Sequence, residues 1–149
     1  SPSPARVICM KYSPGLFLNA MRPDSALRNE NLWIGLEEEA SPHRRMIVRQ
    51  IAGLFARRIV CNLRPGEIIE RGHKFGMIKL GSRTELILPR EEGLCVAVQV
   101  GEKVKAGSSI MARYPVNSVV GRISSPSAED RREACPTVSY PEILPEFGR

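Results

Sequence analysis

Two short segments of this chain, residues 66–72 and 101–107, carry the same pattern of glycine and charge. Both begin with Gly-Glu, place a β-branched residue at the fourth position and close on a second glycine at the seventh. An apolar residue follows each segment at the same distance, Phe75 in one case and Ile110 in the other. Paired glycine turns of this kind make tight corners. The repeat therefore predicts a mainly β domain with little helix, built as a compact, folded-over sheet or flattened barrel-sandwich.

The stretch between the two turns, from Phe75 to Leu88, consists of two apolar runs that meet at Gly81-Ser82. Both runs have strand composition, and the small pair stands where the β pattern would otherwise continue. Glycine adopts backbone conformations closed to other residues, so Gly81 can hold a strained peptide whose carbonyl lies within reach of the Ser82 hydroxyl. That geometry permits attack of the hydroxyl on the preceding carbonyl.

Three further runs have strand composition, and polar, turn-rich segments separate them. The predicted strands are Arg6–Tyr12, Leu32–Leu36 and Arg44–Gly53, the last continued by Leu54–Cys61; the predicted connections are a turn at Ser13-Pro14-Gly15, a surface loop with room for one helical turn over Met21–Asn31 and an exposed hairpin tip over Glu37–His43. A helix across Gln50–Ile59 is an alternative, although Gly53 and the β-branched pair Ile59-Val60 favour a bent strand or a short helical bridge, and both of these stay open.

At 149 residues the chain is long enough for one domain with a core and too short for two of ordinary size. We expect residues 1–114 to form that domain. Residues 115–149 mix Pro, Ser, Glu and Arg with little periodicity, which predicts a disordered tail.

Charge and composition narrow the classes of function. Lys and Arg number 22 against 16 Asp and Glu, and the net charge of +6 favours anionic partners such as lipid headgroups. Aromatic residues make up only 5%, which argues against nucleic acid as a partner.

The four cysteines form no C-x-x-C pair, so we expect no metal site. We expect the thiols to be free or buried, as in a reducing compartment. No apolar run approaches the roughly 20 residues that a membrane span needs, which predicts a soluble or peripheral protein.

Several motifs, taken in order, resemble the phosphatidylserine decarboxylase family. The segment leading to Gly81-Ser82 is similar to the processing segment of that family. The other similar motifs are Arg28–Asn31, Gln50–Gly53 with Ala56–Ile59, and Val100–Gly107. The resemblance runs from Ser1 to about Arg113 and is closest to the short bacterial and archaeal-type enzymes.

The resemblance implies a proenzyme that cleaves itself between Gly81 and Ser82. The Ser82 hydroxyl would attack the Gly81 carbonyl, and elimination and hydrolysis would leave a covalent pyruvoyl cofactor at Ser82. Gly81 would then end a β chain, and residue 82 would begin an α chain. The pyruvoyl group would form a Schiff base with the amine of phosphatidylserine and withdraw the electrons left when carbon dioxide departs, giving phosphatidylethanolamine in phospholipid biosynthesis. The resemblance also implies a cytoplasmic protein that is peripheral to the cell membrane. Its expected partners are an anionic membrane surface and an upstream half or β chain of the proenzyme. Whether the protein forms a homo-oligomer stays open.

The same resemblance implies that two catalytic partners of Ser82 lie outside this chain. Family members carry an aspartate and a histidine in an upstream half that ends near an Asn-Arg-x-Pro segment, and this chain opens with Ser1-Pro2, just past it. Its two histidines, His43 and His73, receive no catalytic role. Ser82 needs a base for its attack and the substrate carbanion needs an acid. We therefore expect these 149 residues alone neither to self-cleave nor to turn over substrate efficiently.

Three alternative functions remain. The first is a pyruvoyl decarboxylase of a small amino acid. The second is a non-catalytic β domain that binds anionic membranes through Arg44, Arg45, Arg49, Arg57 and Arg58. The third is a carrier module like the biotinyl and lipoyl domains, whose glycine turns are similar. A carrier needs a lysine at the tip of a hairpin, where this chain has Gly81-Ser82, and this argues against the third alternative.

Overall fold

The computed structural model describes residues 1–55, 58–78 and 81–114 of the chain. Contacts divide the chain into two compact units, Ser1–Arg90 and Glu91–Arg149. The described part consists mostly of strands with one short helix, which confirms the predicted mainly β class. Arg57 and the predicted disordered tail, residues 115–149, lie outside the described residues.

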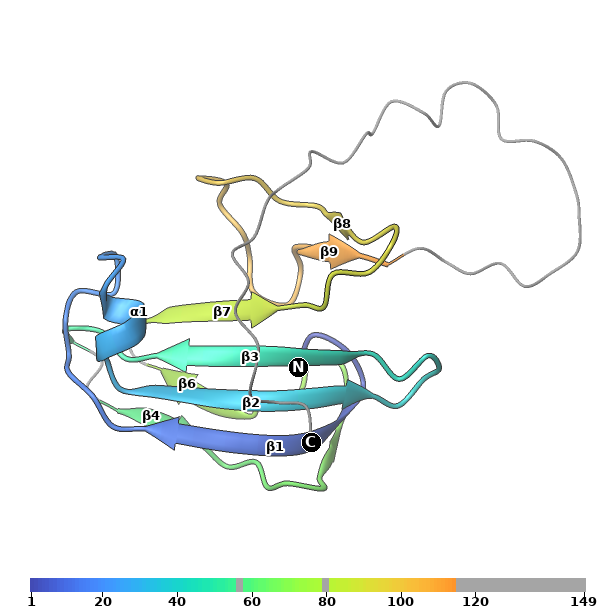
Figure 1. Ribbon diagram of the computed structural model, residues 1–149, viewed down its shortest axis with the longest axis horizontal. Helices are drawn as coiled ribbons and strands as arrows, with labels where there is room; N and C mark the ends of the chain where they lie inside the picture. Colours follow the sequence, from blue (N-terminus) through green and yellow to red (C-terminus); the bar gives the residue numbers. More distant parts are fainter. Residues whose placement is uncertain (56–57, 79–80, 115–149) are drawn as a thin grey trace, which may run out of the picture. The chain divides into compact units, whose positions relative to one another are not determined.

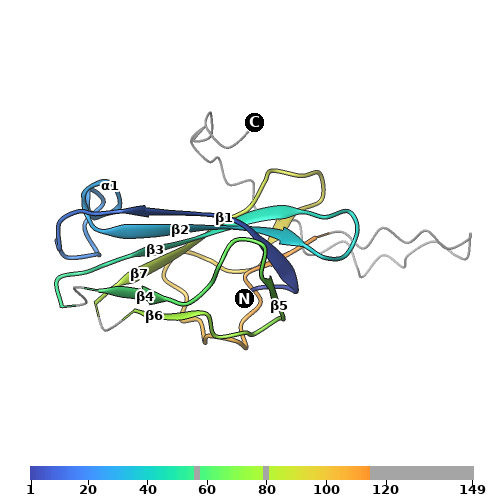
Figure 2. The ribbon, with the colours of Figure 1, turned by 90° about the horizontal axis from the view of Figure 1, so that it is seen from below.

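The first unit is built on a curled, five-stranded antiparallel sheet with the order β5-β1-β2-β3-β7 (Figure 1). Its strands are β1 (Ala5–Ser13), β2 (Asn31–Glu38), β3 (Arg45–Ile51), β5 (Ile68–Ile69) and β7 (Arg83–Ile87). Two more strands, β4 (Ile59–Cys61) and β6 (Gly76–Ile78), pair only with each other among the described strands. Figure 2 shows this pair lying across one face of the curled sheet. The predicted folded-over sheet is therefore present, and the chain crosses from one layer to the other between β6 and β7.

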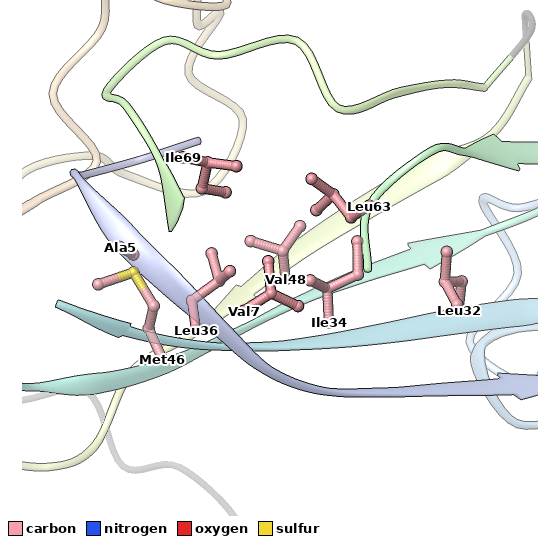
Figure 3. Packing of buried hydrophobic residues seen from close by; sticks show 9 residues of the cluster. All are labelled: Ala5, Val7, Leu32, Ile34, Leu36, Met46, Val48, Leu63 and Ile69. Atoms are coloured by element: carbon pink, nitrogen blue, oxygen red, sulfur yellow. The ribbon is translucent and has the colours of Figure 1, made fainter. Parts of the chain in front are cut away.

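The core lies between the sheet and the segments that cross its face. Along β1, buried Ala5 and Val7 alternate with exposed Arg6 and Ile8, as the period of two in a strand requires. The buried cluster gathers side chains from β1, β2, β3 and β5 of the main sheet against Leu63, which follows β4, as Figure 3 shows: Ala5, Val7, Leu32, Ile34, Leu36, Met46, Val48 and Ile69 meet Leu63. Burying one such aliphatic side chain contributes about 1.5–3 kcal/mol, so this contact holds the two layers together.

The predicted continuation of the third strand is wrong. β3 ends at Ile51 and β4 begins at Ile59, and the two strands belong to different sheets. The alternative of a helix across this region is also wrong, because Gln50 and Ile51 belong to β3 and Ile59 to β4, and the described residues between them are not helical. The chain leaves the sheet after Ile51, two residues before Gly53.

The predicted surface loop over Met21–Asn31 is confirmed only in its first part. It contains one helical turn, α1 (Ser25–Arg28). Ser25 and the three residues after the turn, Asn29, Glu30 and Asn31, are buried instead of exposed. Polar side chains are buried at low cost where hydrogen bonds satisfy them, and those bonds join parts of the chain that are distant in sequence. The exposed hairpin tip is confirmed, with the turn between Glu38 and Arg45.

The internal repeat is confirmed by its hydrogen bonds. One glycine segment lies between the paired strands β4 and β6, and the other between β8 (Cys95–Val96) and β9 (Ala112–Arg113) in the second unit. In the first segment the Glu67 amide donates to the Arg64 carbonyl at 3.1 Å, and its carboxylate accepts from the Arg64 amide at 3.0 Å. Glu102 makes the same two bonds with Gln99, at 3.1 and 2.9 Å. The glycines that open and close both segments have positive φ angles.

The expectation of free thiols holds for two of the cysteines. Cys9 and Cys61 are free and partly buried, and burial raises the pKa of the Cys61 thiol. Cys95 is disulfide-bonded, so the expectation is wrong for that residue.

Candidate functional site

Gly81 and Ser82 lie where the chain passes from the β4–β6 layer to the main sheet. Gly81 has a φ angle of +80°, in the left-handed region that glycine alone adopts without strain. Ser82 directly precedes β7, whose first residue, Arg83, pairs with Ile51 of β3. Before the site, β6 ends at Ile78 and pairs with β4. The Gly81–Ser82 peptide therefore lies between two strands that are anchored in different layers.

Gly53 lies against this peptide. Continuing the pairing of β3 and β7 two residues past the Ile51–Arg83 pair places Gly53 opposite Gly81. A Cβ atom added to Gly53 would overlap the Gly81 carbonyl oxygen and would lie 2.5 Å from the Gly81 carbonyl carbon and 3.2 Å from the Ser82 nitrogen. All three atoms belong to the peptide bond between Gly81 and Ser82. The closeness of this approach is possible because residue 53 has no side chain.

The end of β3 is held in place by Asn29 and Glu30. The Ala52 amide donates to the Glu30 carbonyl at 2.9 Å, and the Ala52 carbonyl accepts from Asn29 Nδ2 at 2.7 Å. Asn29 is 1% exposed and also bonds both backbone groups of Leu18, at 2.9 and 2.8 Å. In the sequence, Asn29 stands out only as part of the motif Arg28–Asn31. Its position beside the site could not be read from a polar, turn-rich run.

Arg49 lies in a buried ionic cluster and not on a basic surface. Its guanidinium pairs with Glu85 at 3.3 Å, lies 4.4 Å from the centre of the Trp33 ring and donates to the Ala26 carbonyl. The residue is 9% exposed. Arg49 thereby links β2, β3, β7 and α1. The alternative function that uses Arg49 as a membrane contact is not supported for this residue, because its charge is used inside the fold.

The other arginines of the expected membrane-binding set are in different surroundings. Arg44 and Arg45 flank the hairpin tip and pair with Glu38 at 3.8 Å and Glu37 at 2.8 Å. Arg58 is exposed. The buried Arg49 is therefore not part of an exposed basic surface with Arg45 and Arg58.

Gln50 contributes a buried acceptor close to the same end of β3. Gln50 is 7% exposed, and within the described part of the chain its Oε1 atom has no hydrogen-bond partner. It pairs in register with Thr84 of β7, two residues after Ser82. A buried acceptor without a partner costs about 1–3 kcal/mol, which singles out Gln50 as a polar group that a ligand or another chain could satisfy.

Neither histidine lies near Ser82. His43 is exposed in the β2–β3 turn, with its Nδ1 atom 3.0 Å from the Glu38 carbonyl. His73 is exposed, and its carbonyl accepts from the amino group of Ser1, just before β1. Because Ala5 of β1 pairs with Glu38, both histidines lie at the end of the sheet where β1 begins. Gly81-Ser82 lies beyond the other end of β3, about 20 Å away at roughly 3.3 Å per residue.

An apolar side chain, that of Phe55, lies beside the peptide. Leu54 and Phe55, which follow Gly53, are 48% and 78% exposed. The Phe55 ring lies 3.4 Å from the point where a Gly81 side chain would begin. The described residues contain no group of three or more His, Cys, Asp or Glu side chains placed to hold a metal ion.

Comparisons with known proteins point to one family. A family model described as phosphatidylserine decarboxylase matches residues 1–112. The chain is 55% identical over 111 residues to a phosphatidylserine decarboxylase proenzyme of Rhodopirellula baltica, covering 74% of this chain and 46% of the relative. It is 42% identical over 116 residues to the proenzyme of Nitrosomonas eutropha, covering 76% and 51%. The chain thus spans about half the length of these curated relatives. No solved structure matches it.

Proposed function

Because this chain belongs to the phosphatidylserine decarboxylase family, we propose that it carries the self-processing site of a pyruvoyl-dependent enzyme that converts phosphatidylserine to phosphatidylethanolamine and carbon dioxide. The observation that carries the proposal is the Gly81–Ser82 peptide, with Gly81 at a φ of +80° and its carbonyl against Gly53. The chain covers about half of its relatives, so the activity is proposed for a longer protein that contains it.

The proposed processing converts a peptide bond into a carbonyl group in three steps. Ser82 Oγ attacks the Gly81 carbonyl carbon, the peptide bond breaks and the hydroxyl proton passes to the Ser82 nitrogen, which leaves an ester. A base removes the α-proton of residue 82, and the Cβ–Oγ bond breaks so that Gly81 leaves as a carboxylate. Water then adds to the resulting dehydroalanine after tautomerisation, and ammonia leaves. The products are a β chain ending at Gly81 and an α chain beginning with the pyruvoyl group.

The surrounding residues fit a group formed at residue 82. The new end of the α chain would remain fixed by the pairing of Arg83 with Ile51, and the β chain would remain fixed by the pairing of β6 with β4. Cleavage at this place therefore leaves both ends held by existing strand pairs. The pyruvoyl carbonyl supplies an electron sink for the bond to the departing carboxylate of an amine-bearing substrate.

The base for this chemistry is proposed to come from the upstream half of the proenzyme. His43 and His73 lie at the opposite end of the sheet from Ser82, so neither supports a role as that base. An aspartate and a histidine from the upstream half would supply the missing proton transfers. The 149-residue chain alone is then inactive.

A lipid is favoured over a small amino acid as the substrate. The exposed Phe55 side chain stands beside the scissile peptide and follows the exposed Leu54 in the chain, and an apolar surface there suits the acyl and glycerol part of a phospholipid. The described residues contain no helix long and apolar enough to cross a membrane. The family match and the net charge of +6 support the further proposal of a cytoplasmic protein that meets an anionic bilayer from its surface.

A decarboxylation assay tests the proposed function. It uses the extended protein, which we define as this chain preceded by the upstream sequence of its own gene. We expect carbon dioxide release from vesicles that contain phosphatidylserine, and loss of that activity after hydride reduction of the carbonyl or in Ser82→Ala. Release from free serine or aspartate but not from the vesicles would instead support the small amino acid alternative. Vesicle binding that persists in Ser82→Ala, without any reducible carbonyl in the wild type, would support the non-catalytic domain.

A further inference from the structure

We propose that Gly53 is a positioning residue for self-cleavage, because the absence of a side chain at residue 53 lets the Gly81 carbonyl rest in the place where Ser82 attacks it. This inference rests on the proposed function, and it adds a residue that the processing chemistry itself does not identify. Gly53 does not take part in the bond changes; it determines where the scissile peptide lies.

The contact is with backbone atoms of the scissile peptide and not with a flexible side chain. A Cβ atom on residue 53 would overlap the Gly81 oxygen and crowd the Gly81 carbonyl carbon and the Ser82 nitrogen. Backbone atoms cannot rotate away as the end of a long side chain can. Substitution of Gly53 therefore has to move either the end of β3 or the Gly81–Ser82 peptide.

The end of β3 is the less movable of the two. Both polar backbone groups of Ala52 are bonded to the Asn29-Glu30 segment, and Ile51 is paired with Arg83. Moving Gly53 away from Gly81 would strain these bonds in a buried region, where water cannot replace a lost hydrogen bond. An added methyl group at residue 53 is therefore expected to displace the Gly81 carbonyl.

Displacement of the carbonyl affects the rate because the attack requires a near-attack geometry. Misplacing reacting groups by about 1 Å can cost on the order of 100-fold in rate. The carbonyl carbon is the atom that Ser82 Oγ must reach, and its distance and angle both change when the peptide moves. A methyl group at residue 53 should thus slow the first step, formation of the ester.

Gly76 provides a matched control. A Cβ atom there would meet the Val60 carbonyl oxygen across the β4–β6 pair and would lie 3.3 Å from the Cys61 α-carbon. Gly76→Ala therefore introduces the same methyl group against the same kind of backbone carbonyl, but on a peptide that is not cleaved. Any slowing caused by general destabilisation should be shared by the two variants.

The experiment follows cleavage of newly synthesised extended protein over time, for wild type, Gly53→Ala and Gly76→Ala, together with their thermal unfolding. We expect Gly53→Ala to retain a cooperative transition and to cleave at least 10-fold more slowly than wild type, and Gly76→Ala to stay within about 3-fold. Hydroxylamine, which cleaves esters, should not restore fragment release in Gly53→Ala, because the ester has not formed. In Gly53→Ala, the decarboxylation rate divided by the number of pyruvoyl groups formed should fall less than the cleavage rate does.

Each other outcome contradicts an identified claim. Cleavage of folded Gly53→Ala at the wild-type rate would overturn the positioning role, and so would equal slowing of both alanine variants. Loss of cooperative unfolding in Gly53→Ala would make the role of Gly53 structural and would also overturn it. If wild-type extended protein does not cleave, the proposed function fails, and this inference fails with it.

Discussion

Buried polar residues fix the geometry next to the candidate site. Asn29 is the clearest case, because its amide group makes three hydrogen bonds to the backbone of Leu18 and Ala52 while the residue is almost completely buried. The amide acts as a bridge between a loop and the end of β3. An aliphatic residue of similar size would leave these backbone groups without partners in a place that water does not reach.

Substitution of Asn29 should therefore destabilise the first unit. We expect Asn29→Ala to lower the free energy of unfolding by about 2–4 kcal/mol, because it leaves buried donors and acceptors unsatisfied. The measurement is urea unfolding of the 149-residue chain. Asn19→Ala is the control, since Asn19 is exposed and, among the described residues, its side chain accepts a hydrogen bond only from the nearby Met21 amide; the substitution should cost less than about 1 kcal/mol. Equal effects of the two substitutions would contradict the bridging role of Asn29.

The sequence could predict Gly81-Ser82 as the cleavage candidate, but not the residues that position this peptide. Gly81-Ser82 was recognisable because a small pair interrupts two apolar runs. Gly53 was recorded only as a residue that disfavours a helix, because its contact with Gly81 depends on a pairing 28 residues away that no local pattern encodes. Asn29 was assigned to a surface loop for the same reason, since its partners at Leu18 and Ala52 become neighbours only after folding.

Strand β3 is the element that joins the parts of the site. It pairs with β2 on one side and with β7 on the other, and its end leads to Gly53. Its local composition was sufficient to predict the strand as far as Ile51. The predicted continuation failed because Ile59, Val60 and Cys61 also have strand composition, and periodicity within a run cannot show that the chain changes sheets between two apolar segments.

Arg49 should behave as part of the fold and not as a membrane contact. We expect Arg49→Ala to lower the free energy of unfolding by about 2–3 kcal/mol, because it removes a buried charge partner of Glu85 and a contact with Trp33. The loss stays moderate because Glu85 keeps Arg83 at 2.7 Å. Unfolding in urea measures the change, and a vesicle-binding assay on the folded variant should show no loss of binding.

Arg45→Ala is the matched control for Arg49→Ala. Arg45 pairs with Glu37 on the surface and its side chain is 70% exposed, so its removal should cost less than about 1 kcal/mol. A larger loss of stability in Arg45→Ala than in Arg49→Ala, or vesicle binding that depends on Arg49 in folded protein, would contradict the buried assignment.

The arrangement of the first unit as a whole explains why a break at Gly81–Ser82 can be tolerated. The bond joins a strand of the covering layer to a strand of the main sheet, and each strand keeps its own partner. The layers are held by the core around Val7, Ile34 and Leu63, which does not include the crossover. A cut at this point should therefore leave the unit assembled from two chains.

The central claim is that the Gly81–Ser82 bond is a self-processing site, and intact-mass measurement tests it most directly. We predict two masses from the extended protein, one for a chain that ends at Gly81 and one for a chain that begins at residue 82. Its Ser82→Ala variant should give one unbroken mass. The 149-residue chain alone should also give one unbroken mass. Cleavage of the short chain at this bond would contradict its predicted inactivity. A single unbroken mass from the wild-type extended protein would contradict the central claim.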